Sequence, residues 1–146
     1  MLGSLGSTLD ARPYTLDVMP TLGHGIDLVD TPRIERLLGE HEQRFLDRVF
    51  TAGEQAYSES GGKLRVQRYA ARFAAKEAVL KVLGTGWSGG IAWTDVEVVK
   101  EATGQPRVVL HGEAGAIAER LGITAWHISL SHLEGHALAS VIGEGD

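Results

Sequence analysis

The chain has 146 residues with 43% hydrophobic and 23% charged residues, no cysteine and a formal net charge of −5. This length suits one domain, and the lack of cysteine excludes a disulfide framework, a zinc-thiolate site and a thiol nucleophile. The negative charge argues against general nucleic-acid binding, which needs a surplus of Lys and Arg. No apolar run approaches the roughly 18 residues of a membrane helix, and residues 1–8 lack the positive charge of a signal peptide. We therefore expect a cytoplasmic protein without a membrane or nucleic-acid partner.

The first 20 residues are rich in Gly, Ser, Thr and Pro and show no steady period. We expect a loosely ordered N-terminal extension here, followed by one domain over residues 21–146. Residues 22–30 predict a strand whose two glycines allow another backbone or a ligand to come close. Asp27 interrupts this apolar run. Because an unpaired buried carboxylate is costly, Asp27 lies either on the exposed face of the strand or beside a cation.

A helix is expected to follow, with Thr31 as its N-cap and Pro32 at the first helical position. Gly39 is expected to bend or break it. Arg33, Arg44 and Arg48 fall on one side if the helix continues, because eleven residues are close to three turns. This arginine row is either a salt-bridged surface or a docking face for an acidic helix.

A capping box formed by Thr51 and Glu54 predicts a short helix to about residue 58, and residues 60–62 form a flexible joint. Residues 66–83 then predict one long helix ended by a C-cap at Gly84. One face of this helix is apolar. On the other side lie a basic row and a Glu–Lys pair four residues apart, made of Arg65, Arg68, Arg72, Lys76, Glu77 and Lys81. These charges form either an ordinary solvated face or, with the Gly84–Gly86 turn, a site for metal-bound phosphate.

The second half of the chain is expected to be mainly strands. Residues 95–99 and 107–110 predict a hairpin, residues 113–121 a short helix, and residues 125–132 and 136–142 a second hairpin. Alternation along residues 125–132 separates an apolar face from one that carries His127, Ser129 and Ser131. No G-x-S-x-G elbow accompanies this polar row, so it fits hydroxyls along a phosphate path better than a serine hydrolase.

Two acids distant in sequence, Asp27 and Glu77, accompany several cations but no cluster of His and Cys. This combination favours a hard cation such as Mg²⁺, which takes one or two protein carboxylates and completes its shell with phosphate and water. Neither a P-loop nor a dinucleotide-binding glycine motif is present. A nucleotide would therefore be held by the turn at the helix end and by basic side chains.

Four motifs carry a family resemblance: G-I-D-L at residues 25–28, F-T-x-x-E at 50–54, R-F-A-A-K-E-A at 72–78 followed by G-T-G at 84–86, and H-x-S-L-S-H at 127–132. In this order they resemble the signatures of holo-acyl-carrier-protein synthases, the small bacterial class of 4′-phosphopantetheinyl transferases. The resemblance implies an α+β fold with an antiparallel sheet packed on one long helix and several short ones. It also implies a homotrimer with the coenzyme A site at the subunit boundary.

The implied activity transfers 4′-phosphopantetheine from coenzyme A to a serine of apo-acyl carrier protein, in fatty acid biosynthesis, and releases adenosine 3′,5′-bisphosphate. By resemblance, Asp27 and Glu77 hold Mg²⁺ against the diphosphate and Lys76 stabilises the phosphoryl oxygens, which makes these three the catalytic residues. The base that takes the serine proton is either Glu77 or a metal-bound water.

The resemblance also implies binding residues. The diphosphate or the 3′-phosphate of coenzyme A is contacted by Arg72 and Lys81, backbone donors come from the turn after the long helix, and the closing signature lines the substrate path. The full coenzyme A set is Arg72, Lys81, Gly84, Thr85, Gly86, Ser129 and His132. Arg33, Arg44 and Arg48 are expected to dock the acidic carrier protein. Two other functions are weighed: a noncatalytic module that binds coenzyme A or carrier protein, and a magnesium-dependent phosphohydrolase, for which the chain lacks a dedicated nucleophile.

Overall fold

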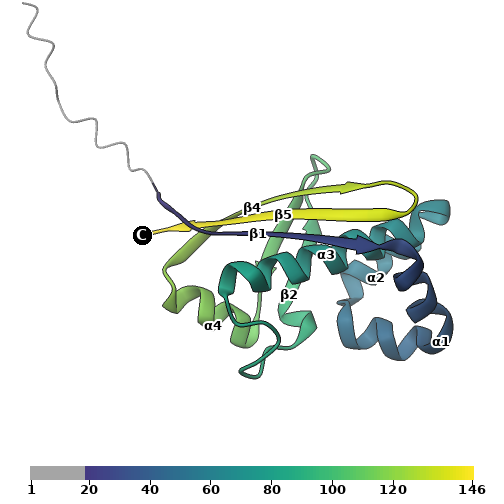
Figure 1. Cartoon of the computed structure of the whole chain (residues 1–146), viewed down its shortest axis with the longest axis horizontal. Coiled ribbons are helices and arrows are strands. Elements are labelled where there is room, and N and C mark those ends of the chain that lie inside the picture. Colours follow the sequence, from purple (N-terminus) through teal and green to yellow (C-terminus); the bar gives the residue numbers. More distant parts are fainter. Residues whose placement is uncertain (1–18) are drawn as a thin grey trace, which may run out of the picture.

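A single long helix, α3 (Arg65–Leu83), lies beneath a three-stranded sheet and contributes many of the core residues (Figure 1). The computed structural model describes residues 19–146, so nearly all of the predicted N-terminal extension lies outside the described residues. Helix α3 begins one residue before its predicted start. It ends as predicted at Gly84, which has φ 74° and donates its N–H to the carbonyl of Leu80 at 2.9 Å. Glycine suits this left-handed C-cap because it has no Cβ to clash.

The sheet on α3 consists of β1 (Thr21–Asp30), β4 (Ile123–His132) and β5 (His136–Gly145) in the order β1-β5-β4. All its pairings are antiparallel, and the predicted β4–β5 hairpin is confirmed. The sequence did not reveal that β5, the last strand, lies in the middle and pairs with β1, the first. In that pairing Asp27 lies opposite Ala139.

Strand β1 packs very closely on α3 because glycine occupies the contact positions. A Cβ on Gly25 would lie 2.0 Å from the carbonyl oxygen of Ala78, and one on Gly23 would lie 2.9 Å from Val82 Cγ1. The two glycines thus admit another backbone, one of the two uses predicted for them. Side chains alternate along a strand, so Asp27 faces α3 like the two glycines.

Two helices connect β1 to α3. The first, α1 (Thr31–Val49), is capped by Asp30, whose Oδ1 accepts the N–H of Arg33 at 3.0 Å. The predicted cap Thr31 is instead the first helical residue. The kink lies at His41, with φ −140° and ψ 41°, rather than at Gly39. The second, α2 (Ala52–Glu59), begins with the predicted Thr51–Glu54 capping box, and a short 3₁₀ turn, η1 (Gly62–Leu64), leads into α3.

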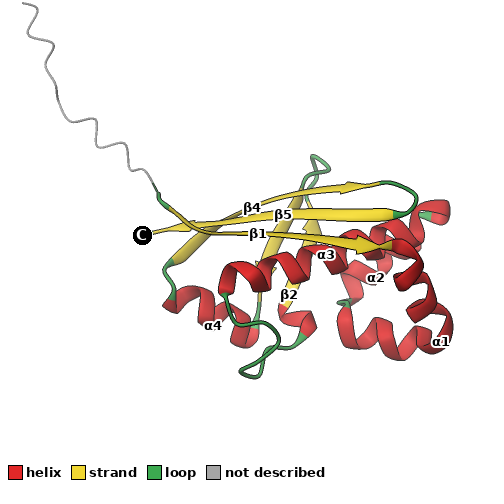
Figure 2. Cartoon of the chain, viewed as in Figure 1, coloured by secondary structure: helices red, strands yellow, loops and turns green. Residues whose placement is uncertain are grey.

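The remaining elements form a smaller layer against α3 and β4 (Figure 2). They are η2 (Trp93–Asp95), the antiparallel hairpin of β2 (Val96–Lys100) and β3 (Pro106–Leu110), and α4 (Gly112–Arg120). Helices and antiparallel sheets in these proportions confirm the predicted α+β class. No helix within residues 19–146 combines the length and the apolar composition needed to cross a membrane.

Candidate phosphate-binding sites

Asp27 lies beside a cation, which was one of the two positions predicted for it. Its Oδ1 is 3.4 Å from Lys81 Nζ, and the same ammonium donates to the carbonyl of Ile26 at 2.6 Å. The Asp27 side chain is 20% exposed and that of Lys81 is 54% exposed. The interpretation that Asp27 occupies the exposed face of the strand is therefore wrong. Lys81 is an accessible cation beside a partly buried acid.

Glu77 joins this group through the geometry of α3. It precedes Lys81 by four residues, so the two side chains share one face of the helix. The indole Nε1 of Trp87, in the loop after α3, lies 3.5 Å from Glu77 Oε1. Trp87 itself lies against Trp93, with ring centroids 3.6 Å apart. We call Asp27, Glu77 and Lys81 the carboxylate cluster.

The donor set of the carboxylate cluster fits a hard cation. It offers carboxylate oxygens and no sulfur or imidazole, which is the chemistry that Mg²⁺ prefers. Within residues 19–146 no group of three or more His, Asp or Glu side chains is arranged to hold a metal. Two acids are nevertheless sufficient where substrate phosphates complete the metal's coordination shell.

Lys76 has a different environment from the one that its predicted catalytic role requires. Its side chain is fully buried, and Nζ donates to Glu54 Oε1 at 2.8 Å, to the carbonyl of Trp93 at 3.2 Å and to the carbonyl of Val96. Burial lowers the pKa of the Lys76 ammonium, and the negative charge of Glu54 opposes this shift. All three N–H donors are engaged, so this ammonium has none to offer a phosphate. We correct its role: Lys76 ties α3 to α2, η2 and β2.

A second cluster lines a cavity of about 660 Å³ between α2, α3, the β2–β3 hairpin and β4. Three of its lining residues, Arg68, Arg72 and Lys100, are cations, and no carboxylate lines it. We call these three residues the cationic cluster and the space beside them the cationic cavity. The predicted ligands Ser129 and His132 also line this cavity, so the structure brings them together with Arg72.

Arg72 is the most confined member of the cationic cluster. It is 4% exposed, and its buried Nε has no hydrogen-bond partner within the described part of the chain. Burial lowers the pKa of its guanidinium. An unsatisfied buried N–H costs about 1–3 kcal/mol. The charge and the free donor both fit a phosphate.

The two clusters lie on opposite sides of α3. At 3.6 residues per turn, Glu77 is rotated about 140° around the helix axis from Arg72, and Lys81 about 180°. The prediction of one continuous charged face, with the carboxylate among the cations, is therefore wrong. One chain presents two separate sites, one at β1 and one near β4, which are the two edges of the three-stranded sheet.

The turn that follows α3 is only partly available to a ligand. The N–H of Gly84 is used by the helix cap, so this residue does not provide the predicted backbone donor. Thr85 and Gly86 continue the turn, with Thr85 Oγ1 donating to the carbonyl of Gly86 at 3.0 Å. Gly86 has φ 57°, a conformation that favours glycine.

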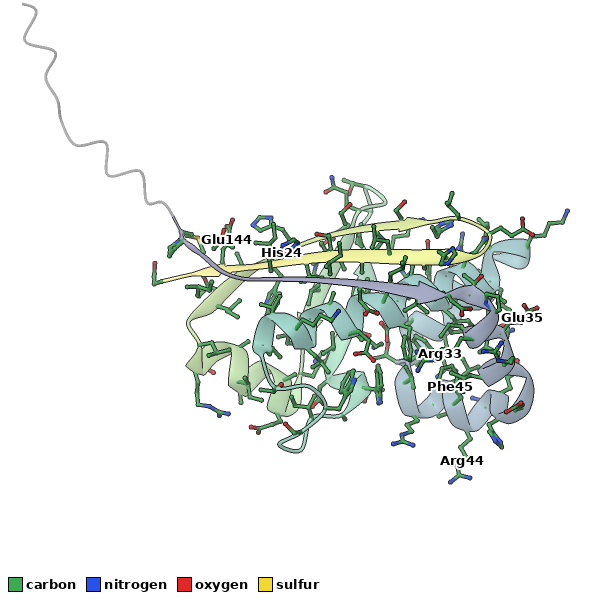
Figure 3. The ribbon with its side chains drawn as sticks, in the orientation of Figure 1. His24, Arg33, Glu35, Arg44, Phe45 and Glu144 are labelled. Carbon is green, nitrogen blue, oxygen red and sulfur yellow. The ribbon has the colours of Figure 1, made fainter. Side chains whose placement is uncertain are left out.

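The predicted docking arginines do not form one straight row, because the kink at His41 divides α1. Figure 3 shows Arg44 pointing away from the ribbon, whereas Arg33 lies on the side of α1 that faces α3. The guanidinium of Arg33 is 5.6 Å from the centroid of the Phe73 ring. Arg44 and Arg48 are both exposed on the second segment of the helix.

Sequence reasoning missed the residues that support these sites from other elements. Tyr57 and Lys100 complete the cationic cavity, and Glu54 pairs with Lys76. The capping-box motif identified Glu54 in the sequence, but the motif accounts only for the hydrogen bond that Glu54 accepts from the Thr51 N–H and not for its pairing with Lys76. No periodicity connects α2 with the end of β2. Only the packed fold brings them to α3.

The described chain combines an α+β fold with the carboxylate cluster and the cationic cluster on two sides of one helix, and comparisons with known proteins identify its family. A model of the 4′-phosphopantetheinyl transferase superfamily matches residues 23–140. The chain is 48% identical over 123 residues to the holo-acyl-carrier-protein synthase of Koribacter versatilis, covering 84% of this chain and 98% of that relative. The chain belongs to the 4′-phosphopantetheinyl transferase superfamily.

Solved structures agree with this assignment. The holo-acyl-carrier-protein synthase of Neisseria meningitidis is similar with a TM-score of 0.76 and 35% identity, covering 86% of this chain and 99% of that one. The Bacillus anthracis holo-acyl-carrier-protein synthase, in complex with coenzyme A (3′,5′-ADP), is similar with a TM-score of 0.70 and 31% identity. That match covers 86% of this chain and 98% of that one.

Proposed function

We propose that this protein is a holo-acyl-carrier-protein synthase that transfers 4′-phosphopantetheine from coenzyme A to a serine hydroxyl of apo-acyl carrier protein. The observation that carries the proposal is the carboxylate cluster: an exposed lysine beside Asp27 and on one helix face with Glu77. Two carboxylates and one exposed cation suit the transfer of a phosphoryl group, in which catalysis depends on positioning and on charge stabilisation.

In the reaction, the serine oxygen forms a bond to the phosphorus that bears pantetheine. The bond from this phosphorus to the bridging oxygen breaks, and adenosine 3′,5′-bisphosphate leaves with its electron pair. Asp27 and Glu77 would hold Mg²⁺, which when bound supplies positive charge at the diphosphate. Lys81 stabilises the phosphoryl oxygens, the role first predicted for Lys76. The serine proton would pass to Glu77 or to a water molecule held beside it.

The 3′-phosphate of coenzyme A is assigned to the cationic cavity. Coenzyme A carries a diphosphate and a phosphomonoester, and the diphosphate belongs to the carboxylate cluster. The monoester then matches the three cations and the unpartnered Nε of Arg72. Ser129 and His132 line the same cavity and can add hydrogen bonds to the nucleotide portion.

A second copy of the chain would let one coenzyme A reach both sites. Within one chain, α3 and the sheet separate the carboxylate cluster from the cationic cluster. The sheet face opposite α3 also carries exposed apolar residues, with Ile26 51% and Leu28 63% exposed. Such a face suits burial against further copies. We therefore propose a homotrimer in which each coenzyme A site combines the carboxylate cluster of one subunit with the cationic cavity of its neighbour.

The carrier protein would dock on α1. Arg44 and Arg48 present exposed positive charge on its second segment, and Arg33 lies over Phe73, one turn before Glu77. An acidic helix seated along these arginines would place its serine near the carboxylate cluster. Charge complementarity of this kind mainly accelerates association and sets register.

The test is the intact mass of an apo-acyl carrier protein after incubation with this protein, coenzyme A and Mg²⁺. We expect a gain of one phosphopantetheine group, which is lost when a chelator is added. The Glu77→Gln variant should fold but transfer at least about 100-fold more slowly, because it removes one charged metal ligand. Coenzyme A that binds without being consumed would identify a binding module instead. Coenzyme A cleavage without a carrier protein would identify a hydrolase.

A further inference from the structure

Three cations surround the ring of one tyrosine at the cationic cavity. The guanidinium carbons of Arg72 and Arg68 lie 3.9 and 4.2 Å from the centroid of the Tyr57 ring, and Lys100 Nζ lies 5.4 Å from it. Arg68 also donates to the backbone carbonyl of Tyr57 at 2.8 Å. The Tyr57 ring, which comes from α2, is thus contacted by two cations from α3 and one from β2.

The carboxylates beside this cluster have other partners, although the lowering of the Arg72 pKa by burial is partly opposed by the negative charge of Glu54. None of its three cations forms an ion pair with another residue in 19–146. Glu54 and Glu97 line a smaller cavity of about 290 Å³ together with Tyr57, Arg72 and Lys100. Both are already engaged, Glu54 by Lys76 and Glu97 by Thr51 and His111. The face of the Tyr57 ring is therefore the negative partner that the three cations share.

We propose that Tyr57 is a positioning residue that sets specificity for a ligand with a 3′-phosphate. This inference rests on the proposed function. The ring holds the cationic cluster together before the substrate binds, although the three like charges repel one another. A phosphomonoester, which carries close to two negative charges near neutral pH, then meets a site that is already ordered.

The geometry leaves the cations free to bind the phosphate. A guanidinium over a ring face keeps its N–H groups in its own plane, available to an anion at the edge of the ring. Arg72 lines the cationic cavity, and its buried Nε has no partner among the described residues. Without the ring, Lys100 would extend into water and Arg68 would keep only its bonds to the Tyr57 carbonyl and to Ser60 Oγ. Ordering the two cations again would weaken binding of the monoester alone. The diphosphate site at Asp27 would be unaffected.

The test compares coenzyme A with 3′-dephospho-coenzyme A as donors for transfer to an apo-acyl carrier protein. For Tyr57→Leu we expect the KM for coenzyme A to rise about tenfold, while the KM for the dephospho form and both kcat values stay within about twofold. Tyr57→Phe is the matched control: it keeps the ring face, so its KM ratio should remain that of the wild type. Equal losses with both donors, or an unchanged ratio in Tyr57→Leu, would overturn the proposal.

A second measurement preserves the side-chain shape and does not depend on turnover. Phenylalanine analogues with increasing fluorination at position 57 weaken the negative ring face at nearly constant size. Calorimetric affinity for adenosine 3′,5′-bisphosphate should fall with each added fluorine, whereas affinity for adenosine 5′-monophosphate should not. A flat series would refute the role of Tyr57 and leave the proposed function intact. A wild-type protein that transfers nothing from either donor would instead remove the proposed function, and this inference with it.

Discussion

The buried ion pair of Lys76 and Glu54 provides a test of whether Lys76 stabilises the fold or takes part in catalysis. The perturbation is Lys76→Met, which keeps the length of the side chain and removes its charge. The variant leaves the Glu54 carboxylate, whose side chain is 0% exposed, without its cation. It also removes the donor to the carbonyls of Trp93 and Val96.

Breaking a fully buried ion pair on one side costs about 3–5 kcal/mol, because the remaining charge stays buried and uncompensated. A chain of this size has roughly 7–20 kcal/mol of stability in total. Each kcal/mol lowers the melting temperature by roughly 2–4 °C at this length, so we expect a decrease of roughly 10 °C. The double variant Glu54→Gln with Lys76→Met should recover most of this loss, because neither charge remains.

The assay pairs thermal unfolding with the rate of phosphopantetheine transfer, measured well below the melting temperature of the variant. Lys76→Met should transfer within about threefold of the wild-type rate, since its ammonium does not face the carboxylate cluster. The matched control Lys81→Met should show the reverse, a nearly unchanged melting temperature and at least about 100-fold slower transfer. A Lys76→Met protein that melts like the wild type but has lost transfer would refute our assignment.

Three further predictions follow from other contacts. Gly25→Ala should destabilise the fold by about 3 kcal/mol or more and slow transfer, because its Cβ would lie 2.0 Å from the Ala78 carbonyl oxygen and force β1 from α3; wild-type stability in denaturant would contradict this. Burial and the hydrogen bond to an acid raise the pKa of the Tyr69 phenol. Above pH 10 the Tyr69 phenol ionises in the unfolded chain but stays protonated in the folded one. The free energy of unfolding should therefore be unaffected by this group below pH 10 and should fall above it. The free energy of unfolding should fall by up to about 1.4 kcal/mol per pH unit in the wild type and by less in Tyr69→Phe. Equal pH dependence in the two proteins would show that Tyr69 is not its cause. Arg44→Glu with Arg48→Glu should raise the KM for carrier protein about tenfold, leave the KM for coenzyme A unchanged and reduce the dependence on salt; an unaltered KM for carrier protein would place the docking face elsewhere.

Local patterns predicted most of the elements because the interactions that form them are local. The capping box at Thr51 and the left-handed glycine at Gly84 set helix boundaries through bonds within a few residues. Where two neighbouring residues could each cap or bend a helix, the predicted position was wrong by one or two residues. Asp30 rather than Thr31 caps α1, and the kink falls two residues after Gly39.

Roles on α3 depended on which neighbour each side chain meets. The sequence of a basic row does not show whether a given lysine forms a buried ion pair or binds phosphate. Lys76 points to Glu54 and the η2–β2 backbone, while Lys81 points to Asp27. Helical rotation separates them, but the packing of α2 and β1 decides which of the two is buried.

The sequence by itself determined the class of chemistry: two acids for a hard cation, basic residues for phosphate, and four motifs that place the chain in its family. Helical spacing already separates Arg72 from Glu77 and Lys81 around α3, but only the tertiary structure decided which of these charges are buried and which residues of other elements lie beside them. The physical reason is that burial and charge pairing are properties of contacts between elements. The contacts of Tyr57 with Lys100 and of Asp27 with Lys81 join residues distant in sequence. They exist only once α2, β1 and the β2–β3 hairpin have packed around α3.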